Sequence, residues 1–274
     1  MRRSPWRSRR NRPAFAQMPP PSGFIRALRL NRGSVPDFGA YPFAIPAIRE
    51  LERLELHRAV TFFVGENGSG KSTLLEAIAV RCGFNAEGGS KNFRFDTRAS
   101  HSELFRHLTL ERGARHPSDG YFLRAESFYN VATELENLDL DYGLHIPTIG
   151  PAYGGSGLHE QSHGQSFFSL LTNRLHGDGV YLFDEPEAAL SPQRQMSALT
   201  LIDDLVSRGS QLIIATHSPI LLAYPDATIY EFSEAGIRPI AYTDTEHFQV
   251  TRDFLNRHEK MLAILLGRLP GMQE

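Results

Sequence analysis

The chain has 274 residues, 41% of them hydrophobic, and a formal net charge of −2, which allow one α/β domain with a full core and argue against a broadly basic nucleic-acid-binding surface. Its single cysteine, Cys82, excludes an intramolecular disulfide and indicates a reducing compartment. Apolar runs are too short to cross a bilayer, so we expect a cytoplasmic protein without a transmembrane segment.

The first 22 residues differ in composition from the rest of the chain. They contain six arginines, no acidic residue and the run Pro19–Pro21. Such a composition favours a disordered extension, although a basic tail is also able to contact nucleic acid or acidic lipid. We therefore expect a disordered tail over residues 1–22 and a single domain over residues 23–274, whose first strand lies in the alternating stretch 24–30.

A buried strand, a glycine-rich turn and a helix start follow one another in residues 59–73, AVTFFVGENGSGKST. This order fits a phosphate-binding loop, in which backbone N–H groups surround the phosphates and a lysine reaches their terminal oxygens. A serine hydroxyl at the helix start is placed to bind magnesium. The predicted nucleotide-binding residues here are Gly65, Glu66, Asn67, Gly68, Ser69, Gly70, Lys71, Ser72 and Thr73.

The middle of the chain carries weaker patterns. We expect a helix over residues 102–113, a buried strand over residues 121–128, a helix over residues 131–143 and a glycine-rich turn over residues 150–157. Residues 161–175 (QSHGQSFFSLLTNRL) then show helical spacing with Ser162 as N-cap. The N-terminus of that helix is suited to bind an anion through Ser162, Gly164 and Gln165, although an ordinary capped helix has the same pattern.

Two further strands end in polar residues that are able to meet the phosphate loop. Residues 180–187 (VYLFDEPE) place Asp184 and Glu185 at the carboxyl end of a buried strand, where open α/β sheets hold their ligands. Residues 211–217 (QLIIATH) end at His217 in the same way. Alone, the acid pair is typical of a solvated strand end and the histidine of a structural residue. A hairpin over residues 227–242 and one or two amphipathic helices that cover the core are expected to complete the domain.

These motifs, in this order, resemble the ATP-binding-cassette (ABC) ATPase superfamily. GENGSGKST is similar to its Walker A motif, QSHGQ to the signature, VYLFDEP to Walker B, EAALS to the D-loop and ATHSP to the histidine switch. The segment LELHRAVTFFVGENGSGKSTLLEAIA is similar to RecF- and SMC-type head domains, which include many stand-alone bacterial ATPases.

The resemblance implies a P-loop fold with a mixed sheet flanked by helices and a helical signature subdomain around residues 100–178. It implies ATP and Mg²⁺ as ligands, with Ser72 and Asp184 at the metal. It further implies catalytic roles for Lys71, Glu185 and His217, and a homodimer formed on ATP binding. In that dimer Ser162, Gly164 and Gln165 would complete the partner's site.

The sequence departs from transporter cassettes at one position that matters. Those cassettes carry a glutamine between Walker A and the signature, whereas no glutamine occurs between Gln17 and Gln161, and Glu126 is the candidate replacement. Gln161 and His163 also depart from the usual signature residues. There is no long insertion between the two halves, so a coiled-coil SMC protein is excluded.

Several functions remain open at this point. A transporter's motor subunit with a membrane permease as partner is disfavoured by the missing glutamine. A nucleotide-gated switch with little turnover, which would close on DNA or protein, fits the same motifs. A P-loop kinase is the third alternative, and it would make the signature and histidine matches coincidental.

Overall fold

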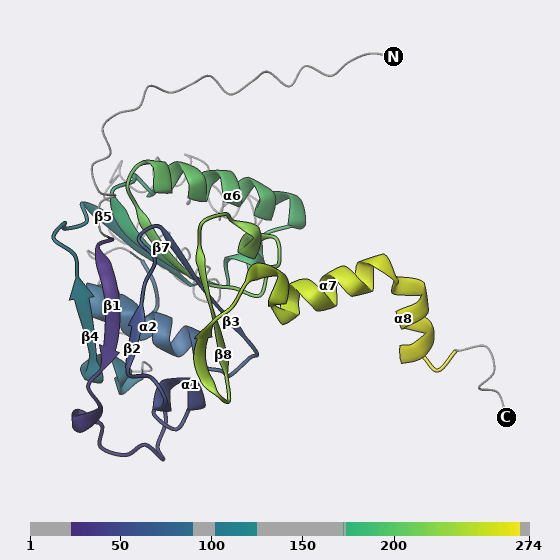
Figure 1. Ribbon diagram of the computed structural model, residues 1–274. Helices are drawn as coiled ribbons and strands as arrows, with labels where there is room; N and C mark the ends of the chain where they lie inside the picture. Colours follow the sequence, from purple (N-terminus) through teal and green to yellow (C-terminus); the bar gives the residue numbers. More distant parts are fainter. Residues whose placement is uncertain (1–22, 90–101, 125–171, 173, 269–274) are drawn as a thin grey trace, which may run out of the picture.

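The computed structural model of the chain describes residues 23–89, 102–124, 172 and 174–268. Its main element is a six-stranded sheet with the strand order β5-β6-β7-β3-β8-β9 (Figure 1). The first five strands in this order are parallel, and the last one is antiparallel to its neighbour. The strands are β5 (Asp119–Arg124), β6 (Gly179–Asp184), β7 (Gln211–Ala215), β3 (Val60–Gly65), β8 (Thr228–Ser233) and β9 (Gly236–Pro239).

A second, antiparallel sheet with the order β2-β1-β4 consists of β2 (Arg53–Glu55), β1 (Ile25–Leu30) and β4 (Leu108–Arg112). Helix α2 (Lys71–Cys82) lies between the two sheets, and its apolar residues join those of β1 and β6 in one core cluster. Helix α6 (Pro192–Ser207) covers the other face of the six-stranded sheet. Helix α1 (Pro46–Arg49) and five short 3-10 turns connect these described elements.

Strand β3 shows why the sheet is rigid. Phe63 packs toward α2, whereas Phe62 and Val64 pack toward α6, and all three are almost fully buried. The alternating directions of side chains along a strand explain this division. A strand that is buried on both faces leaves its carboxyl end at a fixed place, which is where the phosphate-binding loop begins.

The predicted strands near residues 24–30, 59–65, 180–184 and 211–215 are confirmed. The helix expected to begin after the glycine-rich turn is confirmed as Lys71–Cys82. The hairpin is confirmed as β8 and β9. The strand predicted over residues 121–128 is present as β5 up to Arg124, and residues 125–128 lie outside the described residues. The tail over residues 1–22, the helix over residues 131–143 and the turn over residues 150–157 lie outside the described residues.

The helix predicted over residues 102–113 is wrong. A 3-10 turn (Glu103–His107) leads into β4, in which Leu108 and Leu110 pair with Leu30 and Leu28 of β1. Pairing with the edge of β1 outweighs local helix propensity, because it buries Leu108 and satisfies backbone hydrogen bonds at the same time. Residues 102–124 therefore contribute β4 and β5 rather than helix, and a helical subdomain remains a prediction for the rest of the interval 100–178.

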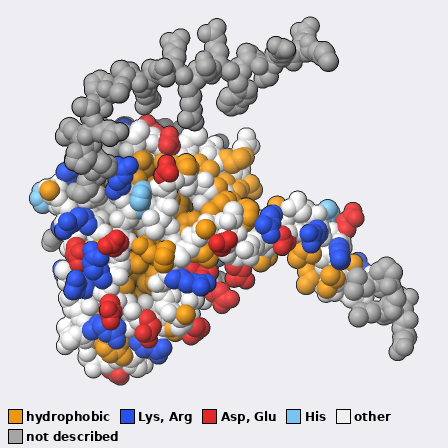
Figure 2. All heavy atoms as spheres, in the orientation of Figure 1, with side chains coloured by type: hydrophobic (Ala, Val, Ile, Leu, Met, Phe, Trp, Pro, Cys, Tyr) orange, Lys and Arg blue, Asp and Glu red, His pale blue; other side chains and the backbone are white. Residues whose placement is uncertain are grey.

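The C-terminal helices are present, but they do not cover the core. The expectation that these amphipathic helices cover the core is therefore wrong. Helices α7 (Glu246–Asn256) and α8 (His258–Leu265), together called the C-terminal arm, have no buried residue and project away from the body (Figure 1). Hydrophobic side chains gather on the surface of its α8 end (Figure 2), where Leu265 is 71% exposed. Among the described helices, none combines the length and the apolar character that a bilayer crossing needs.

Candidate functional site

The loop between β3 and α2 contains three glycines whose conformations explain the motif. Gly65, Gly68 and Gly70 have φ angles of 139°, 80° and 99°. A Cβ atom on Gly65 would lie 2.4 Å from the carbonyl oxygen of Phe232. Both the positive φ and this contact require glycine. The chain therefore turns sharply at the carboxyl edge of the sheet and starts α2 with its N–H groups directed into the loop.

Lys71 is folded onto this loop. Its ammonium group donates to the carbonyl oxygens of Gly65 at 2.7 Å and Glu66 at 2.8 Å, and the residue is only 4% exposed. Burial lowers the pKa of Lys71, and the nearby carboxylates of Glu185 and Asp184 oppose that shift. The amine thus lies inside the turn that would hold a phosphate group.

Ser72 and Asp184 are brought together from opposite sides of the site. The Ser72 hydroxyl donates to Asp184 Oδ1 at 2.9 Å, although 112 residues separate them in the chain. Asp184 is 5% exposed and also faces Arg124, whose Nε lies 3.6 Å from Oδ2. A hydroxyl and a carboxylate oxygen in contact beside a phosphate loop suit a hard cation with oxygen ligands, so these residues fit Mg²⁺.

Glu185 and His217 lie at the same edge. Glu185 adopts φ 50°, and its N–H donates to the carbonyl of Ala215 at the end of β7. His217 Nε2 lies 3.6 Å from Glu185 Oε1, which is beyond hydrogen-bonding range. This nitrogen is buried and has no hydrogen-bond partner among the described residues. Burial, together with the positive charge of Lys71, lowers the pKa of His217 to about 4. The imidazole is therefore neutral at pH 7.

Three residues at this edge were not identified from the sequence. Glu187 accepts from Thr216 Oγ1 at 2.7 Å and from the N–H of His217, and burial raises its pKa. Its place at the start of the EAALS motif, two residues after Glu185, was the available signal. Arg124 follows from the register of β5, in which it pairs with Asp184. His247 is 30 residues from His217 in the chain and reaches it only through the tertiary fold.

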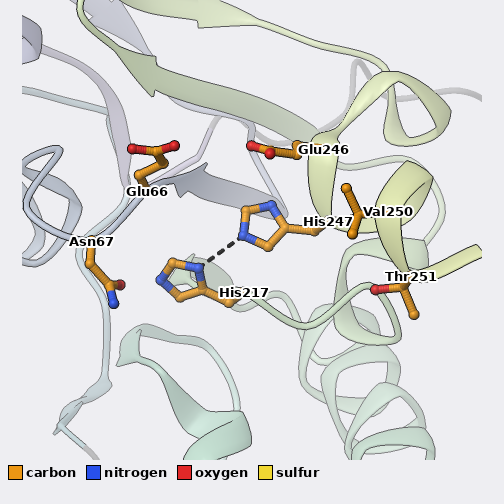
Figure 3. Close-up of a pocket in the computed structure, with 7 residues that line it drawn as sticks. All are labelled: Glu66, Asn67, His217, Glu246, His247, Val250 and Thr251. Atoms are coloured by element: carbon orange, nitrogen blue, oxygen red, sulfur yellow. Dashed lines mark hydrogen bonds between the residues drawn. The ribbon is translucent and has the colours of Figure 1, made fainter. Parts of the chain in front are cut away.

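A pocket of about 530 Å³ opens between the phosphate loop and α7 (Figure 3). Glu66 and Asn67 form one wall, and residues from the first turns of α7 form the other. His217 lies between the walls and points toward His247. The predicted signature residues Ser162, Gly164 and Gln165, and Glu126, lie outside the described residues.

Comparisons with known proteins give matches to P-loop ATPases. A family model described as "AAA domain, putative AbiEii toxin, Type IV TA system" matches residues 159–223, and one described as "AAA domain" matches residues 37–118. The chain is 26% identical over 237 residues to the energy-coupling factor transporter ATP-binding protein EcfA2 of Methanospirillum hungatei. The alignment covers 83% of this chain and 58% of that protein. The chain is therefore similar to ABC-class P-loop ATPases over most of its length.

Other proteins similar to this chain include transporter subunits and SMC heads. The thiamine import ATP-binding protein ThiQ of a Ruegeria species is 29% identical over 172 residues, covering 57% of this chain and 69% of that protein. Among solved structures, the SMC head domain from Thermotoga maritima has a TM-score of 0.43 at 15% identity, covering 79% of this chain and 99% of the head. A nucleotide-free ATP-binding cassette from an ABC transporter has a TM-score of 0.46 at 17% identity, covering 73% and 87%.

Proposed function

We propose that the chain binds ATP with Mg²⁺ and hydrolyses it, and that ATP closes two copies head to tail. The contact between Ser72 and Asp184 is the observation that carries this proposal, because it joins the start of α2 to the end of β6. Lys71, Glu185 and His217 surround the same point from three other positions in the chain. Five groups suited to phosphate, metal and water at one sheet edge support phosphoryl chemistry.

Each residue has a role that its environment supports. The Lys71 amine would exchange its two loop carbonyls for phosphate oxygens, and Ser72 and Asp184 would hold the metal. When bound, Mg²⁺ neutralises charge on the β- and γ-phosphate oxygens. Glu185 would orient the attacking water and accept its proton. His217, whose Nε2 has no hydrogen-bond partner in the described ranges, would contact the γ-phosphate.

The second copy of the chain would supply Ser162, Gly164 and Gln165 to this site. Glu185 has a 40% exposed side chain, and the adjoining pocket contains Asn67 of the loop, so this face has room for a partner. In the proposed dimer the site is complete only when ATP lies between the two copies. The sequence similarity of the phosphate-loop segment to RecF- and SMC-type heads favours a RecF/SMC-like ATPase that acts on a protein or DNA partner.

A transporter subunit is the second candidate function. The names of two relatives, an energy-coupling factor transporter protein and a thiamine import protein, support it. A permease that co-purifies with the chain would favour the transporter function. Stimulation of phosphate release by double-stranded DNA would favour the RecF/SMC-like function.

The Glu185→Gln variant tests the proposed reaction. We expect it to bind ATP but to release phosphate at least about 100-fold more slowly, since the amide does not accept the proton from water. It should also accumulate as an ATP-bound dimer in size-exclusion chromatography with light scattering. Glu259→Gln, the same exchange on the exposed arm, is the matched control. Normal turnover in Glu185→Gln would show that Glu185 is not the base, and absence of ATP binding by the wild type would refute the function.

A further inference from the structure

A second histidine contacts the histidine at the end of β7. His247 lies in the first turn of α7, and its Nε2 is 2.9 Å from Nδ1 of His217 (Figure 3). The two ring centroids are 5.0 Å apart. The opposite nitrogen of His217, Nε2, is buried, has no hydrogen-bond partner within the part of the chain that the structure describes, and lies on the side of Glu185. His247 therefore contacts Nδ1 of His217, the ring nitrogen that the proposed phosphate contact does not use.

The structure holds His247 in this place by contacts independent of the histidine pair. Thr245, which is fully buried, caps α7 by accepting from the N–H of Phe248, and its hydroxyl donates to the carbonyl of Tyr242. The Tyr242 hydroxyl donates to the carbonyl of Pro219 at 2.9 Å. This carbonyl is two residues beyond His217. The first turn of α7 is thus linked through Thr245 and Tyr242 to the loop that carries His217.

The direction of the hydrogen bond decides what His217 offers to a nucleotide. If His247 Nε2–H donates to Nδ1 of His217, the single ring proton of neutral His217 must be on Nε2. Nε2–H is then a donor that faces the phosphate site. If the bond ran the other way, Nε2 would carry a lone pair, which phosphate oxygens would repel. Burial lowers the pKa of both histidines, so a neutral pair is the form present at pH 7.

Charged groups around the pair come from several elements. Lys71 of α2 disfavours protonation of both rings. Glu246 of α7 and Glu231 of β8 favour a charged His247, and Glu185 lies 3.6 Å from His217. Within the described part of the chain, none of these charged groups forms a hydrogen bond with His217 Nδ1, which His247 contacts. His247 is therefore the group placed to select the tautomer of His217.

We propose that His247 is a positioning residue for His217: by donating from Nε2 to Nδ1, it keeps the proton of His217 on the nitrogen that faces the γ-phosphate. The inference rests on the proposed ATPase function for its kinetic consequence. It also links the C-terminal arm to the site, because His247 belongs to the arm.

Steady-state kinetics test the consequence. His247→Phe keeps a ring but removes the donor, and it should lower kcat about 10- to 100-fold while KM for ATP stays within about twofold. His247→Gln retains an N–H donor and should lose much less. Leu255→Ala, a change on the exposed part of α7, is the control and should match the wild type. Equal losses in the Phe and Gln variants would overturn the proposal.

A double mutant separates positioning from a direct or packing role. If His247 acts only through His217, adding His247→Phe to His217→Ala should cause no further loss of kcat. Losses that multiply would overturn the proposal, because they would show that His247 acts independently of His217.

The tautomer is also measurable without turnover. Long-range ¹H–¹⁵N spectra should show His217, assigned by its absence from the His217→Gln spectrum, as the Nε2–H form in the wild type and as a mixture in His247→Phe. A wild-type His217 in the Nδ1–H form, or an unchanged form in the variant, would refute the positioning role. If this spectrum agrees while the wild type hydrolyses no ATP, the proposed function fails and the histidine contact stands.

Discussion

The carboxyl edge of the six-stranded sheet and the C-terminal arm contribute one histidine each to the same contact, but they are held in very different ways. His217 follows β7, in which all five residues are buried. His247 belongs to α7, in which no residue is buried. The sheet edge is positioned by core packing on both faces, whereas the arm is positioned by Thr245, Tyr242 and the histidine contact at its base.

This difference indicates that the sheet edge is the rigid region and the C-terminal arm the more mobile one. Closely packed cores do not deform continuously, so the spacing between Lys71, Asp184 and Glu185 should survive changes elsewhere on the surface. The arm has few contacts with the body and exposes apolar side chains, features that accompany low local stability. The proposed site would thus combine a rigid sheet edge with a weakly packed C-terminal arm.

Core and arm substitutions should differ most in their effect on stability. Phe62→Ala removes a fully buried ring of β3 and should lower the free energy of unfolding by about 3 to 5 kcal/mol. Leu265→Ala, at a side chain that is 71% exposed, should change it by less than about 0.5 kcal/mol. Urea unfolding followed by circular dichroism measures both. A large loss in Leu265→Ala would show that the arm is packed in solution, and the comparison would fail.

The pH dependence of stability should report the buried environment of His217. Its pKa is about 4 in the folded chain and 6.5 in the reference state, so the unfolded chain binds more protons below pH 6.5. The contribution of neutral His217 to the free energy of unfolding is fully present above pH 6.5 and is lost as the pH falls toward 4. Between pH 7 and 5 this amounts to on the order of 1 to 2 kcal/mol.

Urea unfolding at a series of pH values measures this slope. The same experiment on His217→Gln should show a shallower slope over that window, because one titrating group is removed. An unchanged slope would mean that His217 is solvated and protonates normally. The His217 side chain would then not share the close packing of the sheet edge.

Removal of the outer arm should have the smallest effect. Deleting residues 258–274 takes away α8 but leaves Thr245 and His247, so the free energy of unfolding should change by less than about 1 kcal/mol. Phosphate release should remain close to that of the full chain. A collapse of activity in the truncated chain would show that α8 itself, and not only the first turn of α7, acts on the site.

Local patterns predicted much of the site. Gly65, Gly68 and Gly70 are needed for a sharp turn before a helix, and this requirement is visible in the sequence. Strands that are buried on both faces have recognisable apolar runs, so the ends of β3, β6 and β7 were placed correctly, and with them Asp184 and His217. The roles assigned to these residues stay predictions.

Other features depended on partners that are distant in the chain. Residues 108–112 have a pattern compatible with a helix, and only the free edge of β1 makes them a strand. The amphipathic pattern of α7 and α8 predicted helices, but it did not predict which surface they face, because an apolar stripe does not specify its partner.

The sequence by itself therefore determined the phosphate loop, the strands around it and the resemblance to ABC-class ATPases, since each depends on backbone requirements and periodicities within a few residues. The tertiary structure alone decided that Arg124 faces Asp184, that Glu187 binds the loop before His217 and that His247 contacts His217. Such contacts arise from strand register and from the direction in which a helix leaves the body. Both are set by packing between distant segments.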